Sequence, residues 1–299
     1  MIGVTGGKGF IGSHINFADK KLGRDECPLD NFDKTLECFN RYKFDTIIQC
    51  AAEQKNYQKM ITLQADHYHD NAMINLNFFK AAQRSGVNKI IAVSSINAIA
   101  GPPHNITMYN YYREQRIWDG EPDANCYADG HKQRMLHILG RVYNQQHGMK
   151  CLIPMLSNTY GPDSKIDNGV IPILINKCID AKKNKSDFVI NGDGSDLRDF
   201  IYVKDVVKII EWMIYNYDLS DPVILSSGRV NSIKQLVEMI VNAVDFKGKV
   251  VWDTSVKAGQ SSKCCSNEVL KKLLPNFKFT SIEDGIRETA NSFMGERNV

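Results

Sequence analysis

The sequence predicts an α/β protein, with a doubly wound parallel β-sheet and a smaller α/β lobe. Three observations support this class. Short apolar and β-branched runs alternate with longer segments of helical periodicity, an order typical of a parallel sheet covered by helices on both faces. A glycine-rich turn follows the first of these runs directly. The length, 299 residues with 43% hydrophobic and 24% charged side chains, allows one large core or two smaller ones.

The individual elements follow from local patterns. Two segments have helical features: residues 71–85 place apolar side chains at helical spacing, and residues 131–147 end at Gly148, a residue typical of a helix end. Five runs have the length and composition of strands, and they span residues 2–5, 46–51, 89–94, 150–156 and 188–190.

The strongest motif is the turn after the first strand. It reads Thr5-Gly6-Gly7-Lys8-Gly9-Phe10-Ile11-Gly12, with three glycines spaced by three residues. Glycine suits this place because the backbone turns tightly and must approach a pyrophosphate, while the N-terminus of the next helix offers N–H donors. We therefore predict a Rossmann-like dinucleotide site that comprises Gly6, Gly9, Phe10, Ile11 and Gly12.

The pattern becomes less regular in the second half of the chain. Loops such as 192–195 and 257–262 suit a smaller lobe that closes over a ligand. We expect a dinucleotide-binding domain at residues 1–160, with a return segment near 199–226, and a sugar-nucleotide-binding lobe at residues 161–299.

Composition excludes several classes of function. The net charge is +3 without a basic block, so we expect neither nucleic acid nor a membrane surface as a partner. No apolar stretch approaches the ~18 residues that span a bilayer, and the chain starts on a strand rather than a signal peptide. The eight cysteines form no CxxC pair, so we expect free thiols in a reducing, cytoplasmic compartment.

Seven segments carry a resemblance that covers nearly the whole chain in order. They read TGGKGFIG, IIQCAA, DNAMINLNFFKAAQRSGVNKIIAVSS, YNQQHGMKCLIPMLSNTYGPD, GVIPILINK, GDGSDLRDFIYVKDVV and WDTSVKAGQSSK. Together they resemble the extended short-chain dehydrogenases, the NAD-dependent epimerase/dehydratase family, and within it the GDP-fucose synthases. The resemblance implies NADP(H) as cofactor, a sugar nucleotide as substrate with a GDP-linked one favoured, and a homodimer built from the two long helices after Asn71 and His131.

In that family a tyrosine donates the proton, and a lysine one helical turn later lowers its pKa. Tyr127 occupies the tyrosine's place, but His131 occupies the lysine's place. Positions i and i+4 share a helix face, although an unperturbed histidine is mostly neutral above pH ~7. Lys132 keeps its charge, yet at ~100° per residue it lies about 140° around the helix from Tyr127. Two extra residues before Tyr143 make an altered register an alternative, and His131 could equally be an ordinary histidine at a helix start.

Other residues of the family's reaction differ as well. The resemblance assigns the substrate-contacting hydroxyl to Ser95, although an alternative alignment places Ile96 there. The cysteine and histidine that act in epimerisation correspond here to Asn97 or Ala98, and to Gly169. Neither an amide nor a glycine can shuttle the proton, so we expect no epimerisation by the family's route.

The cofactor half is shortened. Eleven residues separate Gly12 from Arg24, too few for a full first helix and a full second strand. Arg24 lies where a basic residue favours NADP, although a solvated basic turn is an equal alternative and NAD stays open. The small residues Ala51 and Ala52 end a later strand, where a cofactor could lie against the backbone.

The substrate side matches the family more closely. Asn158, Lys177 and Arg198 correspond to residues that face the sugar nucleotide, and cationic groups suit its diphosphate. The segment 256–258 departs from the usual lysine-proline-aspartate, so the base could be different. His67 and His69 are spaced by two residues, which does not suit a metal pair on a helix, and we expect no metal site.

Two functions follow from this sequence. The first is an NADP(H)-dependent reductase acting at C4 of a keto-deoxy sugar nucleotide, with Tyr127, Ser95, and His131 or Lys132 at its centre. The second is a catalytically impaired relative that binds a nucleotide or sugar nucleotide as a regulatory or structural partner. The missing lysine favours the second, and the preserved glycine-rich turn favours the first.

Overall fold

The computed structural model describes residues 1–54, 61–101, 112–165, 169–255 and 262–297. Contacts divide the chain into two compact units. The first comprises Met1–Pro102, Arg113–Leu156 and Val207–Leu225, and the second comprises Pro103–Tyr112, Ser157–Val206 and Ser226–Val299.

The first unit contains the predicted parallel sheet. Five strands pair in the order β2-β1-β3-β4-β6, and every neighbouring pair is parallel. Their bounds are β1 (Ile2–Thr5), β2 (Lys20–Leu22), β3 (Thr46–Gln49), β4 (Lys89–Ala92) and β6 (Lys150–Leu152). All residues of β3 and β4 are buried, as expected for strands covered on both faces. The predicted fold class is confirmed.

The sheet continues beyond single-residue interruptions at Val93 and Ile153. The continuing strands β5 (Ser94–Ser95), β7 (Pro154–Leu156) and β11 (Val223–Leu225) pair in parallel in the order β11-β7-β5. The predicted strands at 89–94 and 150–156 are therefore each divided into two short ones.

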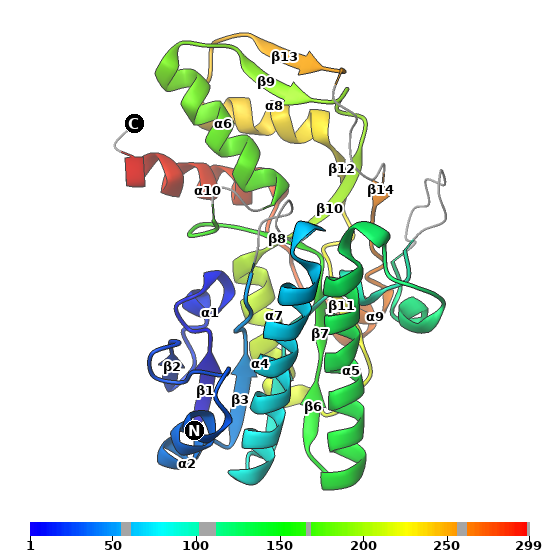
Figure 1. Ribbon diagram of the computed structural model, residues 1–299. Helices are drawn as coiled ribbons and strands as arrows, with labels where there is room; N and C mark the ends of the chain where they lie inside the picture. Colours follow the sequence, from blue (N-terminus) through cyan, green and yellow to red (C-terminus); the bar gives the residue numbers. More distant parts are fainter. Residues whose placement is uncertain (55–60, 102–111, 166–168, 256–261, 298–299) are drawn as a thin grey trace. The chain divides into compact units, whose positions relative to one another are not determined.

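Helices α2 (Phe32–Tyr42), α4 (Gln64–Arg84) and α5 (Tyr127–His147) pack against one another and cover one face of this sheet (Figure 1). Their apolar sides build a core that includes Phe39, Phe78 and Phe79. Gly148 ends α5 with φ of 67°, as its sequence predicts, because glycine adopts the left-handed conformation without a steric cost.

The start of the chain is shortened as expected. Helix α1 (Phe10–His14) has five residues, and β2 has three. The described part of the segment before α5 contains three short 3₁₀ turns, η1 (Ile96–Ala98), η2 (Glu114–Trp118) and η3 (Ala124–Cys126). Arg134 of α5 holds this loop, since its guanidinium donates to the carbonyl oxygens of Ala98 at 2.7 Å and Gly120 at 2.5 Å.

The second unit is a smaller α/β arrangement. Strands β8 (Asn158–Tyr160), β12 (Val230–Ser232) and β14 (Ser262–Lys263) pair with β10 (Leu197–Tyr202), and β9 (Phe188–Asn191) pairs with β13 (Val250–Asp253). Its helices are α6 (Val170–Asn184), α8 (Ile233–Val244), α9 (Glu268–Leu273) and α10 (Ile282–Arg297). Helix α7 (Val203–Asn216) begins in the second unit and ends in the first. Among the described helices, none is long and apolar enough to cross a membrane.

Candidate active site

The glycine-rich turn forms a tight backbone loop. Gly9 donates its N–H to the carbonyl oxygen of Gly6 at 2.9 Å, and Gly6 has a φ of 68°. A Cβ on Gly6 would lie 2.6 Å from the backbone nitrogen of Ala51, and one on Gly12 would lie 2.3 Å from the oxygen of Gly6. Side chains at these two positions would therefore collide with backbone, which explains why the turn requires glycine.

The segment after β3 lies beside this turn and is held by buried amides. Gln49 donates to the carbonyl oxygen of Ala51 at 2.8 Å. Asn71 of α4 accepts from the backbone N–H of Glu53 at 3.0 Å and donates to its carbonyl oxygen at 3.1 Å. The predicted contact residue Ala51 is thus fixed close to Gly6, and Ala52 follows it in the chain.

Arg24 follows β2, at the place that its sequence predicts. Its guanidinium is exposed, 2.9 Å from a carboxylate oxygen of Asp30 and 3.5 Å from one of Glu53. The hydrogen bond to Asp30 and the charges of both carboxylates raise the pKa of Arg24. A phosphate bound here would replace these two exposed carboxylates as the partner of the Arg24 guanidinium.

Tyr127 and His131 lie together at the start of α5. Their ring centroids are 4.5 Å apart, and the rings meet edge to face. His131 Nε2 lies 2.8 Å from Glu121 Oε2, and the Tyr127 side chain is 47% exposed. The structure therefore places His131 on the tyrosine's face of the helix, as the i, i+4 spacing predicts.

Lys132 has a different surrounding. It is buried, and its Nζ lies 3.1 Å from Asp129 Oδ1. The same oxygen is 3.2 Å from His67 Nε2, while Asn97 donates to Asp129 Oδ2 at 2.7 Å. Burial alone would raise the pKa of Asp129, but the charge of Lys132 and the hydrogen bonds from His67 and Asn97 outweigh it and hold that pKa well below its usual range.

The two serines that end β5 differ in their contacts. Ser95 Oγ accepts from the backbone N–H of Asn97 at 3.2 Å and caps η1. Ser94 Oγ is buried and, within the described residues, has no hydrogen-bond partner. The same holds for Thr5 Oγ1 at the end of β1. Sequence reasoning did not single out Thr5, although its place directly before the glycine-rich turn was visible.

Helix α4 presents a row of buried polar side chains that sequence reasoning also missed. His67, Asn71 and Asn75 repeat every four residues and are each at most 5% exposed. They contact Asp129, the backbone of Glu53, and Gln49, respectively. The repeat of polar residues at i, i+4 and i+8 was the available signal, since such a row lies on one helix face.

The predicted substrate residues all lie in the second unit. Asn158 of β8 donates to the backbone oxygen of Asp199 at 2.8 Å. Arg198 of β10 is largely buried, and its guanidinium lies 3.4 Å from Asp196. Burial lowers the pKa of Arg198, and the charge of Asp196 opposes that shift. Lys177 is exposed on α6.

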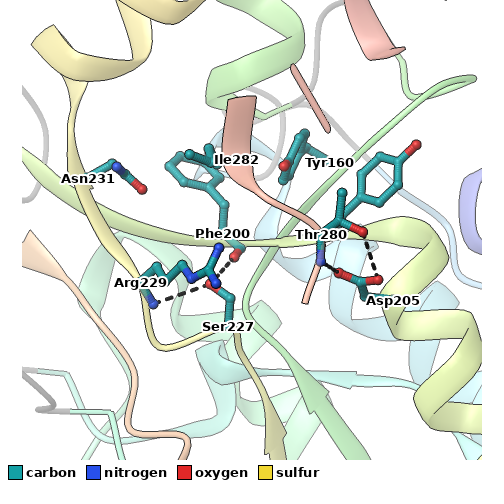
Figure 2. Close-up of a pocket in the computed structure, with 9 residues that line it drawn as sticks. Tyr160, Phe200, Asp205, Ser227, Arg229, Asn231, Thr280 and Ile282 are labelled. Carbon is teal, nitrogen blue, oxygen red and sulfur yellow. Dashed lines mark hydrogen bonds between the residues drawn. The ribbon is translucent and has the colours of Figure 1, made fainter. Parts of the chain in front are cut away.

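The second unit also has a small hollow, shown in Figure 2. Thr280 donates to Asp205 through its backbone N–H and its hydroxyl, and Ser227 donates to the oxygen of Phe200. None of the three predicted substrate residues is among its described lining residues, which are Tyr160, Phe200, Tyr202, Asp205, Ser227, Arg229, Asn231, Thr280 and Ile282. Within the described residues, no group of three His, Cys, Asp or Glu side chains could hold a metal ion.

A family model described as "NAD dependent epimerase/dehydratase family" matches residues 2–225. The chain belongs to this family. The match includes the glycine-rich turn, the row on α4 and the start of α5, so the resemblance found from the sequence segments is confirmed.

Within the epimerase/dehydratase family, the similar proteins include GDP-L-fucose synthases. The protein of that name from Dictyostelium discoideum is 31% identical over 97% of this chain and 94% of its own length. A GDP-L-fucose synthetase from Naegleria fowleri, solved bound to NADP, has a TM-score of 0.89 and 30% identity and covers 100% of this chain and 93% of its own. A putative UDP-glucose 4-epimerase from Methanocaldococcus jannaschii is 28% identical over 85% of each chain.

Proposed function

We propose that this chain is an NADP(H)-dependent reductase that acts on the 4-keto group of a nucleotide-linked deoxy sugar, with a GDP-linked sugar favoured. One observation carries the proposal: Gly6, Gly9 and Gly12 form a tight turn directly after β1, where small residues let a pyrophosphate approach the backbone. The similar GDP-L-fucose synthases, one of them bound to NADP, support the cofactor and the substrate class.

The residues around the turn fit a dinucleotide. Among the described residues, a Cβ on Gly9 would meet only the oxygen of Gly6, at 3.1 Å, which leaves space for a ligand on this side of the loop. The buried hydroxyl of Thr5, without a partner among the described residues, lies at the end of the same strand. Helix α1 is little more than one turn long, so its dipole is small. The backbone N–H groups of the loop would therefore contribute more to pyrophosphate binding than the helix dipole does. Arg24 would hold the additional phosphate of NADP.

When bound, NADPH would supply a hydride for the carbonyl carbon. Tyr127 would donate its phenolic proton to the carbonyl oxygen, assisted by His131, whose ring lies beside the phenol ring. Ser95 can donate its hydroxyl proton to the substrate oxygen, because its contact with Asn97 uses only a lone pair. Asn158, Arg198 and Lys177 would contact the sugar nucleotide.

The proposed reaction is reduction without epimerisation. The Asn97 amide donates a hydrogen bond to Asp129, and an amide does not act as an acid or a base in the neutral pH range. Gly169, at the other expected position, has no side chain. The product would therefore keep the configuration of its ring carbons other than C4.

The alternative function, a binding protein without catalysis, has two observations in its favour. The buried Lys132 is paired with Asp129, and the neighbour of Tyr127 is a histidine instead of a lysine. Such a relative would still bind a nucleotide in the glycine-rich turn.

Calorimetric titration with NADPH, NADH, GDP-mannose and UDP-glucose separates the two functions. We expect micromolar binding of NADPH and weaker binding of NADH. Binding of a sugar nucleotide without any dinucleotide would refute the reductase. If NADPH binds, turnover of a GDP-linked 4-keto sugar is then measured by the loss of nicotinamide absorbance, and an absence of turnover would favour the alternative.

We also propose a homodimer in the cytoplasm. Helices α4 and α5 lie side by side (Figure 1), and their outward sides expose Met73, Leu76, Ile138 and Val142. Apolar side chains that gather on one face are typical of protein contacts. We expect sedimentation to give a dimer and Ile138→Glu to give a monomer, whereas a monomeric wild type would contradict the proposal. The eight cysteines are free thiols, which suits a reducing compartment.

A further inference from the structure

The pair formed by Asp129 and Lys132 is the most deeply buried charge pair at the start of α5. The two residues are 6% and 3% exposed and lie one turn apart on the same helix. A charge at this depth requires a partner, because its desolvation is not otherwise compensated. Each of the two side chains can therefore stay buried and charged only because the other is beside it.

The remaining contacts of Asp129 come from other elements. The charge of Lys132 keeps Asp129 ionised, and an ionised carboxylate can only accept, so His67 Nε2, which lies 3.2 Å from Asp129 Oδ1, carries a proton. Asn97 donates to the second carboxylate oxygen. Asp129 thus receives an ammonium, an imidazole N–H and an amide N–H, a donor set that suits only an ionised carboxylate.

These contacts fix the parts that carry the proposed catalytic side chains. Asn97 belongs to η1, whose cap is Ser95, and Asp129 is two residues from Tyr127. Asn71 links His67 to the segment after β3, because its amide donates to the backbone oxygens of both His67 and Glu53. The described contact of the Lys132 ammonium is with Asp129, and the ring beside Tyr127 is that of His131.

We propose that Lys132 is a positioning residue rather than the cation that assists Tyr127: with Asp129 it forms a neutral buried pair that locks η1, α4 and the first turn of α5 together. The proposal rests on the proposed reductase function and assigns the assisting role to His131 alone. Its physical content is charge balance. Removal of one partner leaves an uncompensated charge, whereas removal of both leaves a neutral site.

The test compares Asp129→Asn, Lys132→Met and the double variant. Each single change leaves a buried charge or an unmatched donor set, so we expect each to lower the melting temperature by roughly 10 °C and to lower kcat at least tenfold. In the double variant an asparagine oxygen can still accept from Asn97, and methionine fills the space of the lysine stem. We expect its melting temperature to return to within about 4 °C of wild type and kcat to recover to within about fivefold.

The pH profile of kcat decides between positioning and direct assistance. If Lys132 only positions, the double variant keeps the basic limb of the wild-type profile. A double variant that recovers its melting temperature but stays as inactive as Lys132→Met, with the basic limb displaced, would overturn the proposal. Additive losses of melting temperature in the double variant would overturn it too, because they would show that the pair is not coupled.

Two readouts remain valid if the protein reduces no keto sugar. The cycle of melting temperatures tests the coupling without any substrate. The phenolate absorbance of Tyr127, obtained as the difference between each protein and its Tyr127→Phe counterpart, tests assistance directly. An unchanged titration of Tyr127 in the double variant supports the proposal, and a titration displaced to higher pH refutes it. Failure of the reductase function would appear separately, as NADPH binding without turnover.

Discussion

The two sides of α5 handle charge in opposite ways within its first two turns. On the exposed side, Tyr127, His131 and Glu121 form a chain of contacts that water can reach, since the glutamate side chain is 70% exposed. On the buried side, Asp129 and Lys132 neutralise each other, and the Asp129 carboxylate also contacts His67 Nε2 and accepts a hydrogen bond from Asn97. The difference teaches that a buried lysine five residues after the proposed proton donor need not assist it, because burial dictates which group the lysine pairs with.

The largest effect should come from the exposed side. Tyr127→Phe removes the proposed proton donor and leaves the ring in place, so we expect kcat to fall by about 10²–10⁴. The affinity for NADPH should stay within about twofold, because the change removes a single hydroxyl at the start of α5. Stopped-flow or steady-state absorbance of NADPH measures the first, and calorimetry measures the second. A variant that keeps more than a tenth of the wild-type kcat would show that the proton comes from elsewhere.

Much of this arrangement follows from local sequence, and part of it does not. The buried strands were predicted because parallel strands covered on both faces are continuous apolar runs, and the end of α5 was predicted because Gly148 adopts a left-handed conformation. The proximity of Tyr127 and His131 follows from their i, i+4 spacing. The site of Asp129 does not, because its partners His67 and Asn97 are 62 and 32 residues away in the sequence. Only the tertiary fold brings His67 and Asn97 to the side of α5 that carries Asp129.

The cofactor half shows the same division. The shortened α1 and β2 could be predicted by counting residues between Gly12 and Arg24. The role of Ser95 as a cap of η1 could not, because the hydroxyl of a serine at a strand end can serve the backbone or a ligand equally well. Its neighbour Ser94 has the buried hydroxyl that no described protein group engages.

The next effect belongs to the buried side of α5. Burial lowers the pKa of His137 to about 3, and neither ring nitrogen has a hydrogen-bond partner among the described residues. In the unfolded chain the same ring takes up a proton near pH ~6.5. Between these two values the unfolded state binds more protons, so stability is complete above about pH 6.5 and is lost as the pH falls toward 3.

From pH 7 to pH 5 this loss amounts to about 2 kcal/mol. We expect His137→Leu to lose about that much less than wild type over the same interval, as measured by urea unfolding at both pH values. His147→Leu is the matched control, because it removes an exposed histidine of the same helix that forms no described ion pair, and it should leave the loss unchanged. Equal pH dependence in the wild type and His137→Leu would show that the imidazole is hydrated or partnered in solution, and would weaken the contrast between the two sides.

The smallest effect restores a cation on the exposed side. His131→Lys places an ammonium at i+4 from Tyr127, where Glu121 can hold it, and lysine stays charged throughout the neutral range. Because a fixed positive charge favours the phenolate, we expect kcat at pH 7.5 to rise about tenfold, a lowering of about 1.4 kcal/mol in the barrier. His131→Gln, which keeps the size and removes the basic group, should instead lower kcat. The contrary result would be that His131→Lys leaves kcat unchanged while Lys132→Met lowers kcat with no loss of melting temperature. Lys132 would then be the residue that assists Tyr127, and His131 would not.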